Sequence, residues 1–149
     1  MDCLNGLTII DLTQGPAGAF CSLQLADFGA RVIKVELPDG GDEGRRLPSQ
    51  RNGRSGYFAD LNRNKESVAL DFTRPESADS LRKLLQTGDL LVDAFSLRAL
   101  ETIGLDEKTL RRERPSLILA SVTAFGRREI GLPEGDDTVV QAMSGIQAM

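Results

Sequence analysis

Short apolar, β-branched runs recur along the first 125 residues, separated by polar or glycine-containing stretches. Such runs are typical of buried strands. We expect strands at 7–12, 31–37, 66–72, 89–95 and 117–125. Helical periodicity fills most of the intervals, and strands that alternate with helices predict right-handed crossovers between parallel neighbours. The fold class is therefore α/β: a Rossmann-like, mainly parallel sheet with helices on both faces.

The helices differ in how much of their surface is apolar. Residues 17–28 are apolar on most sides and end at Gly29, which predicts a helix buried between the sheet and another layer. A second helix should begin at the capping-box spacing from Thr73 to Glu76 and end at Gly88. Further helices are expected at 97–103, with Ser96 as N-cap, at 107–112, with Asp106 as N-cap, and at 138–149.

Residues 39–64 lose this regularity and are expected to form a long loop, which in a compact domain is usually functional or mobile. Basic side chains are concentrated there and just after it. Clustered guanidinium groups can bind phosphates, but interspersed acids make an ordinary solvated loop nearly as good an interpretation. The residues concerned are Arg45, Arg46, Arg51, Arg54, Arg63 and Lys65.

Composition narrows the class of protein. The chain has 149 residues, the size of one domain, and a net charge of −4, which argues against nucleic-acid and membrane-surface partners. It contains no histidine, so the commonest general base and metal ligand is missing. No signal-peptide pattern or apolar run of membrane length is present. Cys3 and Cys21 lack metal-site spacing, and we expect Cys21 to be buried in a cytoplasmic protein.

The candidate chemistry lies between the first strand and the first helix. Gly15 and Gly18 would let the backbone approach a ligand, and the helix N-terminus would attract an anion. Their G-x-x-G spacing suits a plain tight turn equally well. Glu36, at the end of the second strand, stands where dinucleotide-binding folds place a ribose-binding acid, but we favour a surface acid. Asp136 and Asp137 are interpreted as N-cap residues, and the sequence offers no nucleophile–base pair.

The order of motifs resembles the N-terminal portion of the class III CoA-transferases of the CaiB/BaiF type. This family includes formyl-CoA and carnitine-CoA transferases and α-methylacyl-CoA racemases. The resemblance covers essentially the whole chain. It is carried, in order, by DLTQGPAGAFC, LADFGARVIKVELPDGGD, YFADLNRNKESVALDF, DLLVDAF, RPSLILASVTAFG and QAMSG.

The resemblance implies a coenzyme A-binding domain and a reaction that moves CoA from one carboxylic acid to another. The family reaction passes through an acyl-aspartyl anhydride and an aspartyl-CoA thioester. The segments implied to contact CoA are the first glycine loop, the ends of the third and fourth strands, and the start of the last helix. In this chain they comprise Gly15, Pro16, Ala17, Gly18, Leu70, Asp71, Phe72, Thr73, Asp93, Phe95, Gly135 and Asp137.

Several departures from the family pattern bear on function. The family's catalytic aspartate lies beyond the QAMSG segment, so we assign no catalytic residue within residues 1–149. Asp136 stands where the racemases carry a histidine, which counts against racemase chemistry. Leu37, Ala19 and Thr73 replace residues that often support CoA binding in the family, and each lost phosphate-pairing cation could weaken binding by about 1–3 kcal/mol.

The leading hypothesis is an N-terminal portion of a CoA-transferase that binds acyl-CoA and is inactive by itself, since the sequence stops within an apolar helical pattern. The family forms interlocked dimers, which a chain of this length cannot form; simple homodimerisation or association with a separate C-terminal half remains open. One alternative is a non-catalytic interaction module or one chain of a split enzyme. Another is a dinucleotide-binding protein that uses Gly15, Gly18 and Glu36.

Overall fold

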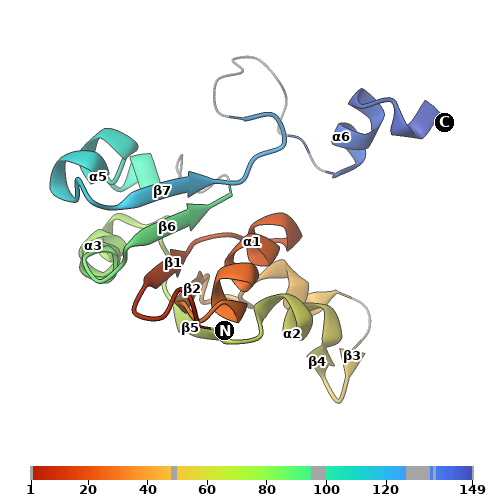
Figure 1. Cartoon of the computed structure of the whole chain (residues 1–149), viewed down its shortest axis with the longest axis horizontal. Helices are drawn as coiled ribbons and strands as arrows, with labels where there is room; N and C mark the ends of the chain where they lie inside the picture. Colours follow the sequence, from red (N-terminus) through yellow and green to blue (C-terminus); the bar gives the residue numbers. More distant parts are fainter. Residues whose placement is uncertain (1, 48–49, 95–99, 127–134, 136, 149) are drawn as a thin grey trace.

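The computed structural model describes residues 2–47, 50–94, 100–126, 135 and 137–148. At its centre is a five-stranded sheet in the order β5-β2-β1-β6-β7, and every neighbouring pair is parallel (Figure 1). The α/β fold with a mainly parallel sheet is therefore confirmed, although the strands are shorter than predicted. They are β1 (Thr8–Asp11), β2 (Arg31–Glu36), β5 (Lys65–Ala69), β6 (Leu90–Asp93) and β7 (Ile118–Ser121).

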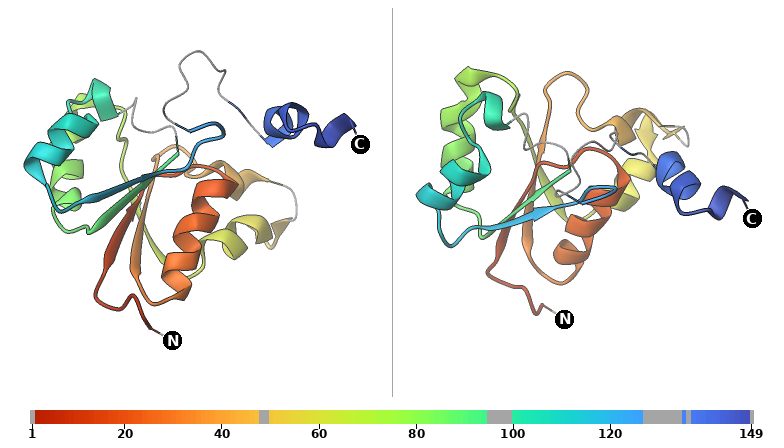
Figure 2. Two further views of the ribbon diagram at one scale, coloured as in Figure 1. Left: turned by 45° about the horizontal axis from the view of Figure 1, so that its top comes forward. Right: turned by 90° about the horizontal axis from the view of Figure 1, so that it is seen from above.

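Helices cover both faces of the sheet. On one face lie α1 (Pro16–Asp27) and α2 (Gly56–Asn62), and on the other lie α3 (Ala78–Leu85) and α5 (Glu107–Glu113), as Figures 1 and 2 show. A short 3₁₀ turn, η2 (Pro75–Ser77), precedes α3. The two faces are joined by crossovers of the kind that alternating strands and helices predict.

The two faces of the sheet differ in chemistry. Ile10, Ile33 and Leu91 point toward α3 and α5 and form the larger apolar core with side chains of those helices. Toward α1, Ile9 and Val32 form a smaller apolar cluster near the amino ends of the strands. Because side chains alternate along a strand, Asp11, Lys34 and Glu36 lie on this same face, nearer the carboxyl ends of the strands. All three are buried.

The prediction of an irregular loop over 39–64 is wrong. The segment contains η1 (Glu43–Arg46), the two-stranded hairpin β3 (Gln50–Arg51) and β4 (Arg54–Ser55), and the helix α2. Asn52 and Gly53 form the hairpin turn with φ of 55° and 72°, the left-handed conformation that an Asn-Gly pair favours. Ser55 then caps α2 by accepting the Phe58 N–H at 3.2 Å.

Two predicted helices have different boundaries in the structure, and one predicted N-cap is confirmed. The Thr73 hydroxyl donates to Asp71 at 2.5 Å, so it does not form the predicted capping box, and α3 begins only at Ala78. The last predicted helix is divided into α6 (Asp137–Met143) and η3 (Ile146–Ala148) because Gly145 adopts φ 81° between them. The predicted N-cap at Asp106 is confirmed by its bond from the Thr109 N–H, whereas Ser96 lies outside the described residues.

The last helical segments project from the sheet rather than covering it. Figures 1 and 2 show α6 and η3 set apart from the sheet and its helices. Met143 and Ile146 are exposed there, as is Ile118 on the edge strand β7. None of the helices in the described part of the chain is long and apolar enough to cross a membrane.

Candidate functional site

The carboxyl ends of the strands meet at one edge of the sheet, and the β1–α1 loop lies there. The chain passes from β1 to β2 on one side, while β6 pairs with β1 on the other. Such a reversal of strand order leaves a crevice at the carboxyl ends, where open α/β sheets bind ligands. We call residues 12–15, between β1 and α1, the glycine loop.

The two glycines at this position serve different purposes. Gly15 has φ 89° and ψ 179°, a backbone conformation that essentially only glycine adopts, and a Cβ there would meet nothing within 4 Å. A Cβ on Gly18 would lie 2.4 Å from the Cβ and Cγ2 of Thr13. Gly18 is therefore required by the close packing of α1 against the loop rather than by approach to a ligand.

The first two residues of α1 are open to solvent, whereas the third, Gly18, is buried. No side chain caps the N-terminus of α1, Pro16 occupies its first turn, and Pro16 and Ala17 are both exposed. The N–H groups of Ala17 and Gly18 precede the first intrahelical hydrogen bond, which Ala19 makes to the Gly15 carbonyl. These two N–H groups and the partial positive charge of the helix end suit an anionic group.

Asp11, at the end of β1, accepts hydrogen bonds from both the glycine loop and α1. One carboxylate oxygen accepts the Thr13 N–H at 2.9 Å and the Thr13 hydroxyl at 2.6 Å, and the other accepts the Ser22 hydroxyl at 2.5 Å. Ser22 lies on α1, so this one fully buried carboxylate ties the loop to the helix that follows it.

Lys65 neutralises Asp11. Its ammonium lies 3.2 Å from the Asp11 carboxylate and also donates to the Ala19 carbonyl and the Asn62 side chain, each at 2.9 Å. These contacts join β1, α1, α2 and β5. Burial lowers the pKa of Lys65; Asp11 opposes that shift, and the ammonium of Lys34 adds to it. Lys65 is therefore occupied internally and is no member of a phosphate-binding loop.

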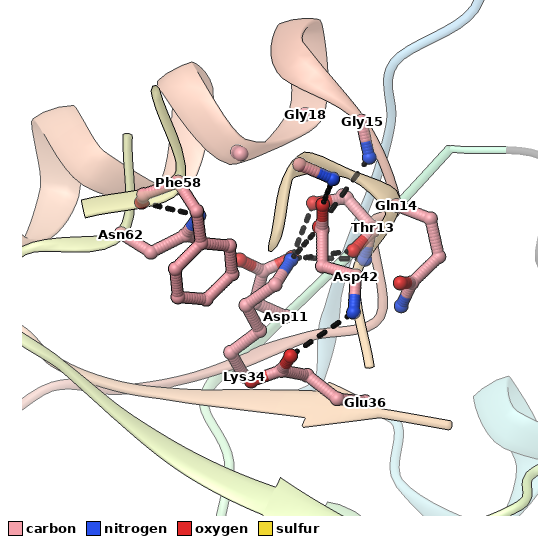
Figure 3. Close-up of polar contacts among 12 residues, drawn as sticks. Asp11, Thr13, Gln14, Gly15, Gly18, Lys34, Glu36, Asp42, Phe58 and Asn62 are labelled. Atoms are coloured by element: carbon pink, nitrogen blue, oxygen red, sulfur yellow. Dashed lines mark hydrogen bonds and ion pairs between the residues drawn. The ribbon is translucent and has the colours of Figure 1, made fainter. Parts of the chain in front are cut away.

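Lys34 connects the glycine loop to the segment that follows β2 (Figure 3). Its side chain is 1% exposed, and its ammonium lies 2.8 Å from an Asp42 carboxylate oxygen and 2.7 Å from the Thr13 carbonyl oxygen. The same Asp42 oxygen accepts the Gly15 N–H at 3.4 Å. A buried lysine needs such partners, because an unpaired charge in the interior is costly.

Glu36 is a buried residue, so the expectation of a surface acid is wrong. It accepts hydrogen bonds from the Arg45 guanidinium at 2.6 and 2.7 Å, the Ser67 hydroxyl at 2.6 Å and the Asp42 N–H at 3.0 Å. Burial by itself would raise the pKa of Glu36, but Arg45, Ser67 and the Asp42 N–H outweigh it and hold the pKa at about 2. With both oxygens engaged, Glu36 does not offer a free acceptor for a ribose.

The predicted group of basic residues does not form one cluster. Arg45 pairs with Glu36 and stacks on the Phe58 ring, with its guanidinium carbon 3.8 Å from the ring centroid. Arg63 pairs with Asp27 at the end of α1. Arg46 and Arg54 are exposed, and the side chain of Arg51 lies outside the described residues. Arg54 lines a separate open hollow of about 470 Å³ over the β3–β4 hairpin and α2.

The end of β5 lies at the same edge of the sheet as the glycine loop. Asp71 and Thr73 form a tight turn in which Asp71 accepts the Thr73 N–H and hydroxyl and pairs with Arg74. These hydrogen bonds lower the pKa of Asp71 despite the opposing effect of partial burial. Phe72 is buried in the larger core, and Leu70 packs against it. Asp71 and Thr73 thus offer polar atoms at this edge, while Leu70 and Phe72 serve packing.

The other predicted residues fall into two places. Asp93, at the end of β6, is buried and accepts the Ser121 hydroxyl at 2.5 Å, so it too ends at the carboxyl edge. Gly135 lies against Phe125, and Asp137 begins α6 and accepts the Gln141 side chain. Among the described residues, no hydrogen bond or ion pair joins Gly135 or Asp137 to the glycine loop. Phe95 and Asp136 lie outside the described residues.

The structure revises the expectation about the burial of Cys21. Cys21 is half-buried rather than buried; burial and the nearby Asp11 carboxylate raise the pKa of its thiol, and Lys65 opposes them. Cys3 is exposed. The described part of the chain holds no group of three or more Cys, Asp or Glu side chains that could bind a metal ion.

The fold and the site define a Rossmann-like α/β domain with the glycine loop at the switch point of its sheet. Comparison with known proteins places it further. The family model for CoA-transferase family III matches residues 4–149, and the chain belongs to this family.

Individual relatives agree with the family assignment. The chain is 36% identical over 157 residues to a succinate–glutarate CoA-transferase of Agrobacterium fabrum, covering 98% of this chain and 38% of that protein. It is 40% identical over 124 residues to a formyl-CoA:oxalate CoA-transferase of Afipia carboxidovorans, covering 83% of this chain and 29% of that protein.

Solved structures show the same fold. The crystal structure of Rv3272 from Mycobacterium tuberculosis superimposes with a TM-score of 0.86 at 37% identity, over 98% of this chain and 40% of that one. A CaiB/BaiF family protein from Brucella suis gives 0.87 at 35% identity, over 97% and 39%. The chain thus spans no more than about two fifths of the length of these relatives.

The buried Glu36 carboxylate predicts a specific acid sensitivity. Its pKa is lowered from 4.5 to about 2, so its contribution to stability is fully present above pH 4.5 and is lost as the pH falls toward 2. Glu36→Gln should lower the free energy of unfolding at pH 7 by about 2–3 kcal/mol, and the difference from wild type should shrink between pH 4.5 and 2. Urea unfolding at several pH values measures it. Glu66→Gln, which removes an exposed partner of Arg31, is the control; an equal, pH-dependent loss there would contradict the prediction.

The packing of Gly18 predicts a second effect on stability. In Gly18→Ser the new Cβ would collide with Thr13, so we expect a loss of about 1–3 kcal/mol in the free energy of unfolding. Ala17→Ser introduces the same side chain at the exposed neighbouring position, where a Cβ is already present, and should stay within about 0.5 kcal/mol of wild type. Equal stability of the two variants in urea would show that Gly18 is not held by this contact.

Proposed function

We propose that this chain is the CoA-binding Rossmann-like portion of a family III CoA-transferase. The observation that carries the proposal is the uncapped N-terminus of α1 at the switch point of a sheet whose family is that of CoA-transferases. The diphosphate of CoA would be accepted by the Ala17 and Gly18 N–H groups. The polar atoms of the half-buried Asp71 and the exposed Thr73 would contact other parts of the cofactor at the neighbouring strand end.

The reaction proposed for the whole protein is transfer of CoA between carboxylic acids. The names of the relatives, which include succinate, glutarate and oxalate as substrates, support small carboxylic acids as donor and acceptor. In the proposed mechanism an aspartate attacks the acyl-CoA thioester carbonyl and releases CoA as a thiolate. The thiolate then attacks the resulting anhydride to form aspartyl-CoA and free carboxylate. The acceptor carboxylate reverses these two steps and leaves as the new thioester.

Within that mechanism we assign binding, and no covalent step, to residues 1–149. Of the acids near the glycine loop, Asp11, Glu36 and Asp42 are buried and each is committed to several internal donors. A nucleophile must reach the thioester carbonyl, and these carboxylates face the interior. We therefore expect residues 1–149 alone to show no transferase turnover with succinyl-CoA and glutarate. Sustained turnover by the purified chain would contradict this assignment.

Dinucleotide binding is the weaker alternative. It would need Glu36 to accept ribose hydroxyls, and Glu36 instead accepts Arg45, Ser67 and the Asp42 N–H. The interaction-module alternative has one favouring observation, the exposure of Ile118, Met143 and Ile146 on β7, α6 and η3. Light scattering tests it, because self-association through these side chains would raise the measured mass with concentration.

Ligand binding at α1 can be tested without disturbing the fold. Ala17→Asp places a carboxylate in the first turn of α1, where it favours the helix but repels a diphosphate. In isothermal titration we expect wild type to bind CoA weakly and Ala17→Asp to bind at least about tenfold more weakly, with no loss of melting temperature.

The matched control is Asn5→Asp, which adds the same charge at an exposed position before β1, at the opposite edge of the sheet. Its affinity for CoA should equal that of wild type. Equal affinity of Ala17→Asp and wild type would contradict binding at the helix end. A thermal shift of wild type by NAD or NADP larger than by CoA would favour the dinucleotide alternative.

A further inference from the structure

The Asp42 carboxylate lies directly beside the glycine loop although it belongs to another segment, the one between β2 and η1. It is 2% exposed, and its two oxygens face different partners. One accepts the Gly44 N–H at 2.7 Å, which fixes the carboxylate on its own segment. The other contacts Lys34 at 2.8 Å and accepts the Gly15 N–H at 3.4 Å, as Figure 3 shows.

We propose that Asp42 is a positioning residue for CoA binding: by accepting the Gly15 N–H it orients the glycine loop so that the Ala17 and Gly18 N–H groups alone receive the anion. The inference rests on the proposed function for the identity of the ligand. It assigns Gly15 a conformational role, since the N–H of Gly15 is turned inward to Asp42 and away from the ligand.

Lys34 also orients the backbone of the glycine loop, through its contacts with Thr13 and Asp42. Its ammonium donates to the Thr13 carbonyl oxygen and pairs with Asp42, so the carbonyl of Thr13 and the N–H of Gly15 are both turned toward the interior. The φ of 89° at Gly15 is the backbone conformation that allows this orientation. The chain then enters α1 at Pro16, and Pro16 and Ala17, the first two residues of the helix, are exposed.

The position of Asp42 also depends on Arg45, a partly exposed residue that contacts it through Glu36. The Asp42 N–H donates to Glu36 at 3.0 Å, and Glu36 is held by the guanidinium of Arg45. The side chain of Arg45 is 42% exposed. A continuous series of contacts therefore runs from Arg45 through Glu36 and Asp42 to the glycine loop. A change at Arg45 should reach the loop, and its effect should be smaller than that of a change at Asp42.

The experiment compares wild type, Asp42→Asn and Asp39→Asn in the whole chain. Asp39 is an exposed acid of the same segment, so its variant controls for charge. Amide hydrogen exchange of residues 13–15, 17 and 18, followed by NMR, reports the glycine loop and the first turn of α1, and isothermal titration reports CoA affinity. In Asp42→Asn we expect faster exchange of the Gly15 amide and weaker CoA binding, each by at least about fivefold. Amides in β6 and β7 should exchange as in wild type, and Asp39→Asn should change neither quantity.

The outcomes separate the two proposals. Unchanged Gly15 exchange in a folded Asp42→Asn variant overturns the positioning role. Faster Gly15 exchange together with no CoA binding by wild type supports the positioning of the loop but overturns the proposed function. Faster exchange with unchanged CoA affinity overturns the link between loop position and binding. If Asp42→Asn does not fold, Arg45→Gln serves instead: accelerated Gly15 exchange supports the inference, and wild-type exchange overturns it.

Discussion

The rest of the site depends on the ion pairs that two buried lysines form on the interior side of the glycine loop. Lys65 neutralises Asp11, and Lys34 neutralises Asp42, while Arg45 neutralises Glu36 at the edge of the same network. Each acid therefore has a cation beside it in the space between the sheet and α1. Removing one partner of a fully buried pair, such as Lys34 and Asp42, costs about 3–5 kcal/mol, because the other charge is left uncompensated. The network thus specifies one conformation of the loop that connects β1 to α1.

This network also explains why the two faces of the sheet differ in polarity. The face toward α3 and α5 is apolar and supplies most of the core, with Ile10, Ile33 and Leu91 at its centre. The face toward α1 has fewer apolar contacts, because buried ion pairs occupy the space close to the carboxyl ends of the strands. The larger apolar core lies on one face, and the ion pairs that order the glycine loop lie on the other.

The sequence predicted the sheet well and the site incompletely. Apolar runs located all five parallel strands because strand burial on both faces is a local signal. The hairpin and α2 were missed although Asn52-Gly53 and Ser55 carry turn and capping signals, since neither has a long periodic pattern. Lys34 was missed for a physical reason: charge in a strand suggests exposure. Its alternation with Ile33 and Val35 in a strand covered on both sides could have revealed a buried, paired ammonium. Gly18 and Glu36 were noticed, but their tertiary contacts could not be inferred locally.

A double-mutant cycle on Lys34 and Asp42 tests the central claim most directly. The free energies of unfolding of wild type, Lys34→Met, Asp42→Asn and the double variant would be measured in urea. If the ion pair beneath the glycine loop is the organising interaction, the double variant should lose less stability than the sum of the single losses, by more than about 1 kcal/mol. Losses that add to within about 0.5 kcal/mol would contradict it, because additivity is the behaviour of residues that do not interact.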